Sequence, residues 1–178
     1  MALSPQVIDD AAALCGQFEG FASEPYLDPA GVLTIGFGTT RTPDGNPIGA
    51  GTGPIDRTTA ARWMRTDLSI RASTIAPWLP LDATPGQQVA CLSLAYNIGL
   101  SAFRTSTLLK LWQLGQTALA AEQFPKWIWG GGRVLPGLIT RRAIERALFE
   151  GEPGPDPEVA IVEALNVAEL ARIRGERT

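Results

Sequence analysis

Apolar residues near the start of the chain recur at the spacing of an α-helix. Between residues 5 and 19 they fall three and four positions apart, which is the period of one helix face. Pro5 suits the first turn of a helix after Ser4, and Gly20 is a residue that commonly ends one. The pattern therefore predicts a helix over residues 5–19.

The pattern changes to that of strands and turns over residues 25–40. Residues 28–31 read Asp-Pro-Ala-Gly, which is turn chemistry, and residues 32–37 are rich in β-branched and aromatic side chains. These features predict a small antiparallel hairpin or meander. Residues 41–54 are so rich in Gly and Pro that we expect a loop.

Helical spacing returns after the loop, with two clear start signals. Asp56 precedes an apolar stripe that extends to about residue 76, so it is expected to cap that helix. Thr84 and Gln87 flank Pro85 as in a capping box with proline at the first helical position. The helix that follows is apolar nearly all round, which predicts a buried central helix.

Shorter helices are expected after Gly99, over about 106–114, 116–127 and 137–150. The triple glycine at 130–132 separates the last two. These elements predict an α+β, mainly helical fold with one small sheet near the N-terminus. We expect a catalytic domain over residues 1–151 with two lobes, its small β part at about 25–55. Residues 152–178 would form a linker and a C-terminal helix docked on that domain.

Composition narrows the functional classes. The 178 residues are 45% hydrophobic and 19% charged, enough to bury a core, and they contain no histidine. The missing histidine excludes Ser-His-Asp and Cys-His catalysis and the usual zinc hydrolase sites. No metal or cofactor is implied. A net charge of −3 argues against nucleic acid as a partner, and it removes broad attraction to an anionic cell wall.

The two cysteines and the N-terminal residues indicate in which cellular compartment the chain is expected. Cys15 and Cys91 lie among apolar neighbours, so we expect two buried thiols, with a disulfide between them as the alternative. The chain has no basic start, and Asp9 and Asp10 precede its short apolar run, which fits neither a signal peptide nor a membrane span. The chain is therefore expected to accumulate in the cytoplasm.

Three polar residues lie where the first helix gives way to the hairpin. Glu19 is at the end of a helix, where the helix dipole favours the protonated acid that a glycosidic oxygen needs. Asp28 lies in a solvated turn and should stay ionised, which completes the pair of carboxylates used in glycoside hydrolysis. Taken singly, Glu19, Asp28 and Thr34 are better explained as a helix end, a turn former and a strand residue.

The segment FEGFASEPYLDPAGVLTIGFGTT resembles the active-site segment of phage-type lysozymes, glycoside hydrolase family 24. That family has Glu, eight residues, Asp or Cys, five residues and Thr, and Glu19, Asp28 and Thr34 satisfy the spacing. The resemblance continues through Gln88–Leu92 and over Gly137–Arg142. It covers roughly residues 7 to 151. The resemblance departs at Thr39, where many relatives have histidine.

The resemblance implies a lysozyme-like fold and a muramidase that cleaves the β-1,4 bond between N-acetylmuramic acid and N-acetylglucosamine. Glu19 would be the general acid. Asp28 and Thr34 would position a water on the opposite face of the sugar, which gives inversion and requires carboxyl groups roughly 6.5–9.5 Å apart. The resemblance also implies that three residues at positions where the family contacts glycan bind substrate. These residues are Thr40, Tyr96 and Ser106.

Arginines and tryptophans supply further candidates. Arg141 falls on the inward face of its helix and needs a carboxylate partner, which is either Glu145 one turn later or Glu19 across a cleft. Arg142 is expected to point outward. Two tryptophans beside the triple glycine are candidates for stacking on sugar, although core packing is the role expected for them. The two candidates are Trp127 and Trp129. Trp63 and Trp112 fit apolar stripes and are expected in the core.

The leading hypothesis is an endolysin that lyses the host cell. It would act on peptidoglycan strands as a monomer, held in the host cytoplasm until a holin or another route gives access to the wall in the periplasm. A lytic transglycosylase is the enzymatic alternative, because it needs one Glu but no water-positioning partner. The alternative from another class is a non-catalytic glycan-binding module on a lysozyme scaffold.

Overall fold

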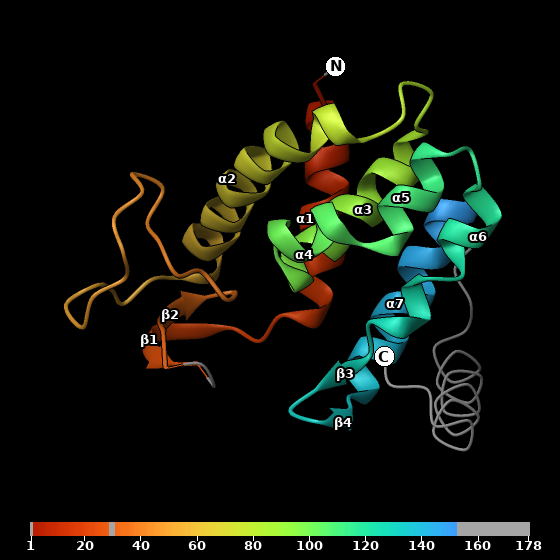
Figure 1. The fold of residues 1–178 in the computed structure, drawn as a ribbon. Coiled ribbons are helices and arrows are strands. Elements are labelled where there is room, and N and C mark those ends of the chain that lie inside the picture. The colour runs from red at the N-terminus through yellow and green to blue at the C-terminus, as the bar shows by residue number, and fades with distance from the viewer. Residues whose placement is uncertain (1, 29–30, 153–178) are drawn as a thin grey trace. The chain divides into compact units, whose positions relative to one another are not determined.

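A computed structural model describes residues 2–28 and 31–152. They divide into two compact units, residues 2–76 and the residues from Pro77 onward. Each unit is described by itself, and Figure 1 labels their elements. The predicted linker and docked helix of residues 152–178 lie, from residue 153 onward, outside the described residues.

The first unit begins with α1 (Pro5–Phe18), which confirms the predicted helix. Ser4 caps it, because the Val7 N–H donates to Ser4 Oγ at 3.3 Å, and proline occupies the first turn. Its inward face consists of buried residues at helical spacing: Val7, Ile8, Ala11, Leu14 and Cys15.

Strands β1 (Ala22–Leu27) and β2 (Leu33–Gly36) form the predicted antiparallel hairpin. Leu27 pairs with Leu33 beside the turn, and Ala22 pairs with Gly36 at the open end, with a register shift between the two ends. Residues 41–54 contain no helix or strand, apart from one isolated bridge, so the prediction of a loop is confirmed.

Helix α2 (Arg57–Ile75) completes the first unit and packs on α1 and β2. Its cap is Asp56, whose Oδ1 accepts the Thr59 N–H at 2.7 Å, as predicted. The buried face consists of Ala60, Met64, Leu68, Ala72 and Ile75. Trp63, expected in the apolar stripe, is half-buried.

Helix α3 (Pro85–Ile98) is the core of the second unit, after the short helix η1 (Ala76–Trp78). The predicted capping box is present: the Gln87 N–H donates to Thr84 Oγ1 and the Thr84 N–H donates to Gln87 Oε1. All eight residues of 88–95 are buried, which confirms the prediction of a buried central helix.

The helices that cover α3 are shorter and more numerous than predicted. They are α4 (Leu100–Thr105), α5 (Thr107–Gln113), α6 (Thr117–Ala121) and η2 (Phe124–Lys126). Helix α4 was not predicted, because six residues are too few to show a period. The single helix expected over 116–127 is wrong, since Pro125 has no N–H to continue it.

A second hairpin joins β3 (Trp129–Gly130) to β4 (Arg133–Val134), so the prediction of one small sheet is wrong. Gly131 and Gly132, with φ of 57° and 76°, form its turn. Two consecutive positive φ values are what a two-residue hairpin turn requires and what glycine allows. The triple glycine therefore makes a hairpin as well as a break between helices.

Helix α7 (Pro136–Glu150) packs along α3 and ends at Gly151, whose φ is 76°. Its apolar end contributes Phe149, which contacts Trp112 and Phe124 at ring-centroid distances of 4.9 and 5.5 Å. This aromatic cluster joins α5, η2 and α7 into one core. The mainly helical α+β fold class is therefore confirmed.

Both cysteines are buried and form no disulfide within the described residues, as expected. Burial raises the pKa of the Cys91 thiol well above its ordinary value, and the Glu145 carboxylate raises it further. Such a thiol stays protonated and behaves as an apolar core group.

Candidate active site

Glu19 lies immediately after α1 and serves as its C-terminal cap. Its backbone N–H donates to the Cys15 carbonyl at 3.1 Å, while its φ of −87° and ψ of 128° turn the chain out of the helix. The residue is half-buried. The end of a helix is thus the element that sets the position of this carboxylate, as the sequence predicts.

Asp28 and Thr34 are brought together by the hairpin, because both hydrogen-bond to the same residue. The Val32 N–H donates to Asp28 Oδ1 at 2.8 Å, and Thr34 Oγ1 donates to the Val32 carbonyl at 3.1 Å. Thr34 is buried, with 3% of its surface exposed, whereas Asp28 is half-buried. The two side chains therefore lie at the closed end of the hairpin.

The turn beside Asp28 is held by its backbone. The Asp28 N–H donates to the Val32 carbonyl at 3.0 Å, and the Gly31 N–H donates to the Asp28 carbonyl at 2.9 Å. With the side-chain bond to Val32, these contacts restrict the Asp28 carboxylate to a small range of positions. A carboxylate and a hydroxyl held in this way are suited to orient a water molecule.

The three residues expected to contact glycan are in different surroundings. Thr40 is exposed beside the hairpin, and its carbonyl accepts the Ile48 N–H at 3.0 Å. Tyr96 is half-buried on α3. Ser106 is 5% exposed and caps α5, since its Oγ accepts the Leu109 N–H at 3.1 Å. The role of these three residues in binding stays a prediction.

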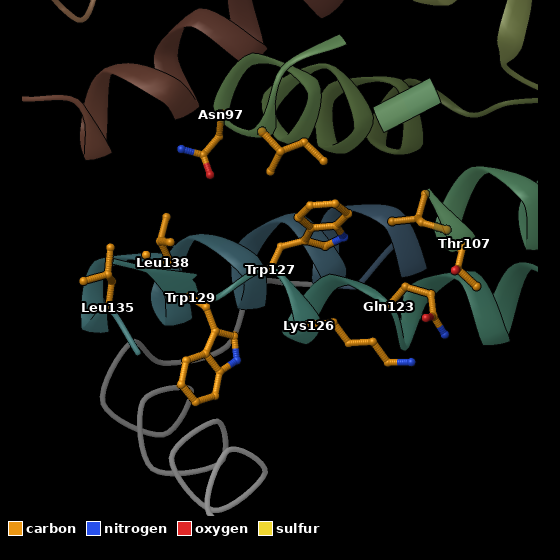
Figure 2. A pocket seen from close by; sticks show the side chains of 11 residues that line it. Asn97, Thr107, Gln123, Lys126, Trp127, Trp129, Leu135 and Leu138 are labelled. Atoms are coloured by element: carbon orange, nitrogen blue, oxygen red, sulfur yellow. The ribbon is translucent and has the colours of Figure 1, made fainter. Parts of the chain in front are cut away.

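The second unit contains a pocket of about 770 Å³. Figure 2 shows walls that come from the end of α3, the region around η2 and the beginning of α7. Both tryptophans beside the triple glycine line it, although core packing was the role expected for them. The lining consists of Asn97, Ile98, Thr107, Leu108, Gln123, Lys126, Trp127, Trp129, Gly130, Leu135 and Leu138.

The pocket combines flat apolar surface with a few polar groups, which is typical of ligand sites. Sequence reasoning missed its amides and its lysine, and it named the residues next to two of the lining positions. Tyr96 precedes Asn97, and Ser106 precedes Thr107. The sequence signal that could have identified these lining residues is that a polar residue, Asn97 or Thr107, directly follows a predicted glycan contact.

A buried ionic cluster joins α7 to α3. Glu145 Oε1 accepts hydrogen bonds from Arg141 Nε at 3.1 Å, Arg142 Nη2 at 2.8 Å and Ser93 Oγ at 2.6 Å. Both arginines are 1% exposed and Glu145 is fully buried. The alternative in which Glu145 is a partner of Arg141 is therefore confirmed.

The outward orientation predicted for Arg142 is wrong. Arg142 lies three positions before Glu145 and seven before Phe149, so the three residues share one face of α7, and all are buried. Burial raises the pKa of Glu145 above its ordinary value, and Arg142, Arg141 and Ser93 oppose that shift.

Comparison with known proteins identifies the family. The model of the phage lysozyme family matches residues 16–145. This match covers most of the chain.

The chain belongs to the phage lysozyme family.

An endolysin of Acyrthosiphon pisum secondary endosymbiont phage 1 is 32% identical over 148 residues, which covers 81% of this chain and 97% of that endolysin. The solved endolysin of Escherichia coli O157:H7 phage FAHEc1 has a TM-score of 0.70 at 29% identity, covering 88% of this chain and 98% of that one. The muramidase domain of SpmX from Asticaccaulis excentricus has a TM-score of 0.66 at 28% identity, covering 78% and 93%.

These relations make the chain a glycoside hydrolase of the lysozyme class, an endolysin type of enzyme that acts on the bacterial cell wall. Its substrate is peptidoglycan. None of the helices in residues 2–28 and 31–152 is both long and apolar enough to cross a membrane. The same described residues contain no cluster of three or more metal-ligating side chains.

Proposed function

We propose that this lysozyme is an inverting muramidase with Glu19 as general acid. It would cleave the β-1,4 bond between N-acetylmuramic acid and N-acetylglucosamine. The observation that carries the proposal is the closed end of the hairpin, where Asp28 and Thr34 both bond to Val32. Two polar groups held that close together suit the positioning of one water molecule.

The proposed reaction uses two carboxyl groups with different tasks. Glu19 donates its proton to the glycosidic oxygen as the bond to the anomeric carbon breaks. Asp28 accepts a proton from the water that attacks that carbon from the other face, and Thr34 orients the water by a hydrogen bond. The products are a free hydroxyl and an inverted reducing end. This geometry requires carboxyl groups roughly 6.5–9.5 Å apart.

Further residues of the chain have supporting roles in this proposal. The pocket beside Trp127 and Trp129 would hold sugar units by stacking, with amide and hydroxyl groups for their polar substituents. Thr40, Tyr96 and Ser106 stay as candidate glycan contacts. Arg141 would support the site electrostatically, in addition to its contact with Glu145.

A lytic transglycosylase is the closest alternative. Such an enzyme closes a 1,6-anhydro ring and uses no attacking water, so it has no need of a second positioned polar pair. The pairing of Asp28 and Thr34 favours hydrolysis. A non-catalytic glycan-binding module is disfavoured, since the matched relatives include endolysins and a muramidase domain.

The cellular setting is also a proposal. We expect residues 1–151 to act as one monomeric catalytic domain. The enzyme would stay in the host cytoplasm until a holin or another route admits it to the wall. Its restricted access would then set the time of lysis.

Substitution Glu19→Gln tests the proposal. We expect cleavage of purified peptidoglycan to fall by about a thousandfold or more, because the amide keeps the shape of the side chain and cannot donate the proton. Turbidity loss and the release of reducing ends measure the rate. Glu24→Gln is the matched control, since Glu24 is an exposed carboxylate in β1 and should be dispensable. Near wild-type activity of the Glu19→Gln protein would refute the assignment.

A further inference from the structure

The hairpin that carries Asp28 and Thr34 has a second, open end, where the chain arrives from Glu19. Ala22 and Gly36 form the last pair there, and Phe21 and Phe37 continue beyond them. The two rings contact each other at a centroid distance of 5.5 Å with an interplanar angle of 53°. This ring pair therefore joins the segment just after Glu19 to the segment just after Thr34.

Arg57, the first residue of α2, contacts this ring pair through Phe21. Its guanidinium carbon lies 4.7 Å from the centroid of the Phe21 ring, within the range of a cation–π interaction. A cation in the first turn of a helix is opposed by the helix dipole, so helix formation gives no reason for an arginine here. The contact with Phe21 supplies a reason.

The segment of residues 55–60, which leads into α2 and forms its first turn, also contacts both strands. The Ile55 N–H donates to the Ser23 carbonyl in β1 at 2.9 Å. Gly36, with φ of 67°, lies so close to α2 that an added Cβ would meet the Ala60 Cβ at 3.0 Å. Figure 1 shows the hairpin beside the start of α2 in the first unit. The first turn of α2 is thus a support against which the open end of the hairpin is held.

The ladder between the two ends cannot provide this support alone. The register shifts between the Ala22 pair and the Tyr26 pair, so the strands are not regularly bonded along their length. The distance between Glu19 and the hairpin turn therefore depends on how the open end is closed. A general acid misplaced by about 1 Å loses about a hundredfold in rate.

From these contacts we propose that Arg57 is a positioning residue for catalysis. Through the ring of Phe21, it sets the place of Glu19 relative to Asp28 and Thr34. Arg57 itself touches no reacting atom in this account. The inference rests on the proposed function, since it requires that Glu19 be the acid.

The test is a double-mutant cycle on Arg57 and Phe21, measured as kcat and KM on soluble peptidoglycan fragments. We expect Arg57→Met to lower kcat about tenfold and to leave KM within about twofold, because the substrate still binds while the acid is displaced. Arg57→Lys keeps a cation over the ring and should restore most of the rate. Arg62→Met, at an exposed arginine of the same helix, is the control and should match wild type.

The cycle identifies the route of the effect. If Arg57 acts through the ring, Arg57→Met should change little in a Phe21→Leu background, and the two losses should not multiply. The inference would be overturned if the kcat losses of Arg57→Met and Phe21→Leu multiplied in the double variant. It would also be overturned if Arg57→Met raised KM without lowering kcat, or if its kcat equalled that of wild type. A loss of activity that merely follows the unfolded fraction in a thermal melt would overturn it as well.

The Glu19→Gln protein separates this inference from the proposed function. If that protein is active, the proposed function fails whatever Arg57 does. If it is inactive and Arg57→Met equals wild type, only the positioning inference fails.

Discussion

The two units of this lysozyme use charged residues in opposite ways. Residues 1–76 have five Lys and Arg against eight Asp and Glu, whereas residues 77–152 have seven against five. In the first unit the candidate catalytic carboxylates, Glu19 and Asp28, are half-buried at the ends of elements. In the second unit three charged groups are fully buried and bonded to one another.

This difference separates chemistry from stability. A carboxylate that must exchange protons with substrate or water has to be reached by them, and its place at a helix end or a turn allows this. A carboxylate bonded to two buried arginines is out of reach and holds helices together. We therefore expect substitutions in the first site to lower activity and those in the buried cluster to lower stability.

The largest effect on stability is expected from Glu145→Ala. Alanine removes both carboxylate oxygens, so the buried Arg141, Arg142 and Ser93 lose this hydrogen-bond acceptor, which should cost about 3–5 kcal/mol of unfolding free energy. Denaturant unfolding measures this loss. Glu150→Ala is the control on the same helix, because its partner Arg146 is 41% exposed and the pair should contribute less than about 1 kcal/mol. Equal effects of the two substitutions would break the comparison.

The same residue gives a pH dependence with a defined sign. Because burial raises the pKa of Glu145 above 4.5, the folded chain binds this proton more tightly than the unfolded chain does. Its contribution to the unfolding free energy therefore falls as pH rises from about 4.5 through the folded pKa. Glu145→Gln should remove that part of the slope, and an unchanged slope would contradict the assignment.

Asp28→Asn should show the opposite behaviour. The amide oxygen still accepts the Val32 N–H, so the turn is kept, but the charge that holds the water is lost. We expect kcat to fall by about a hundredfold, or ~2.7 kcal/mol in activation free energy, with the melting temperature nearly unchanged. Asp44→Asn, at an exposed loop position, is the control. A Tm that falls along with kcat would make Asp28 a structural residue instead.

The smallest effect is expected from Trp129→Ala, which tests whether the pocket of the second unit binds substrate. Trp129 is 40% exposed, so its removal spares the core, and the loss of stacking should raise KM about fivefold to tenfold with little change in kcat. Leu114→Ala, at a 73% exposed apolar residue outside the pocket, should leave KM as it is. An unchanged KM for Trp129→Ala would mean that this pocket does not bind substrate, and that substrate binding as well as catalysis is to be sought in the first unit.

The features that could be predicted from sequence are those decided by local chemistry. The caps at Ser4 and Thr84 depend on one side chain and the backbone three positions away, so the sequence shows them directly. The closeness of Asp28 and Thr34 follows from a short hairpin. In each case the partners lie a few residues apart.

The features that were missed depend on packing. Arg142 was expected in solvent because the helical wheel placed its neighbour Arg141 on the inward face, and only the packing of α7 on α3, which carries Ser93, shows that both arginines are buried. Each strand of the β3–β4 hairpin has only two residues, too few for a period of two to be seen. Arg57 and Phe21, which are in contact, are 36 residues apart in the sequence, so no local sequence pattern predicts their contact.

The central claim is that water, held opposite the proton donor, attacks the sugar. The most direct measurement is mass analysis of peptidoglycan fragments released in water enriched in oxygen-18, with proton NMR of the first anomer formed. The account predicts muramic acid reducing ends that carry one heavy oxygen atom and appear first as the inverted α-anomer. Fragments that end in a 1,6-anhydro ring and carry no heavy oxygen would contradict it.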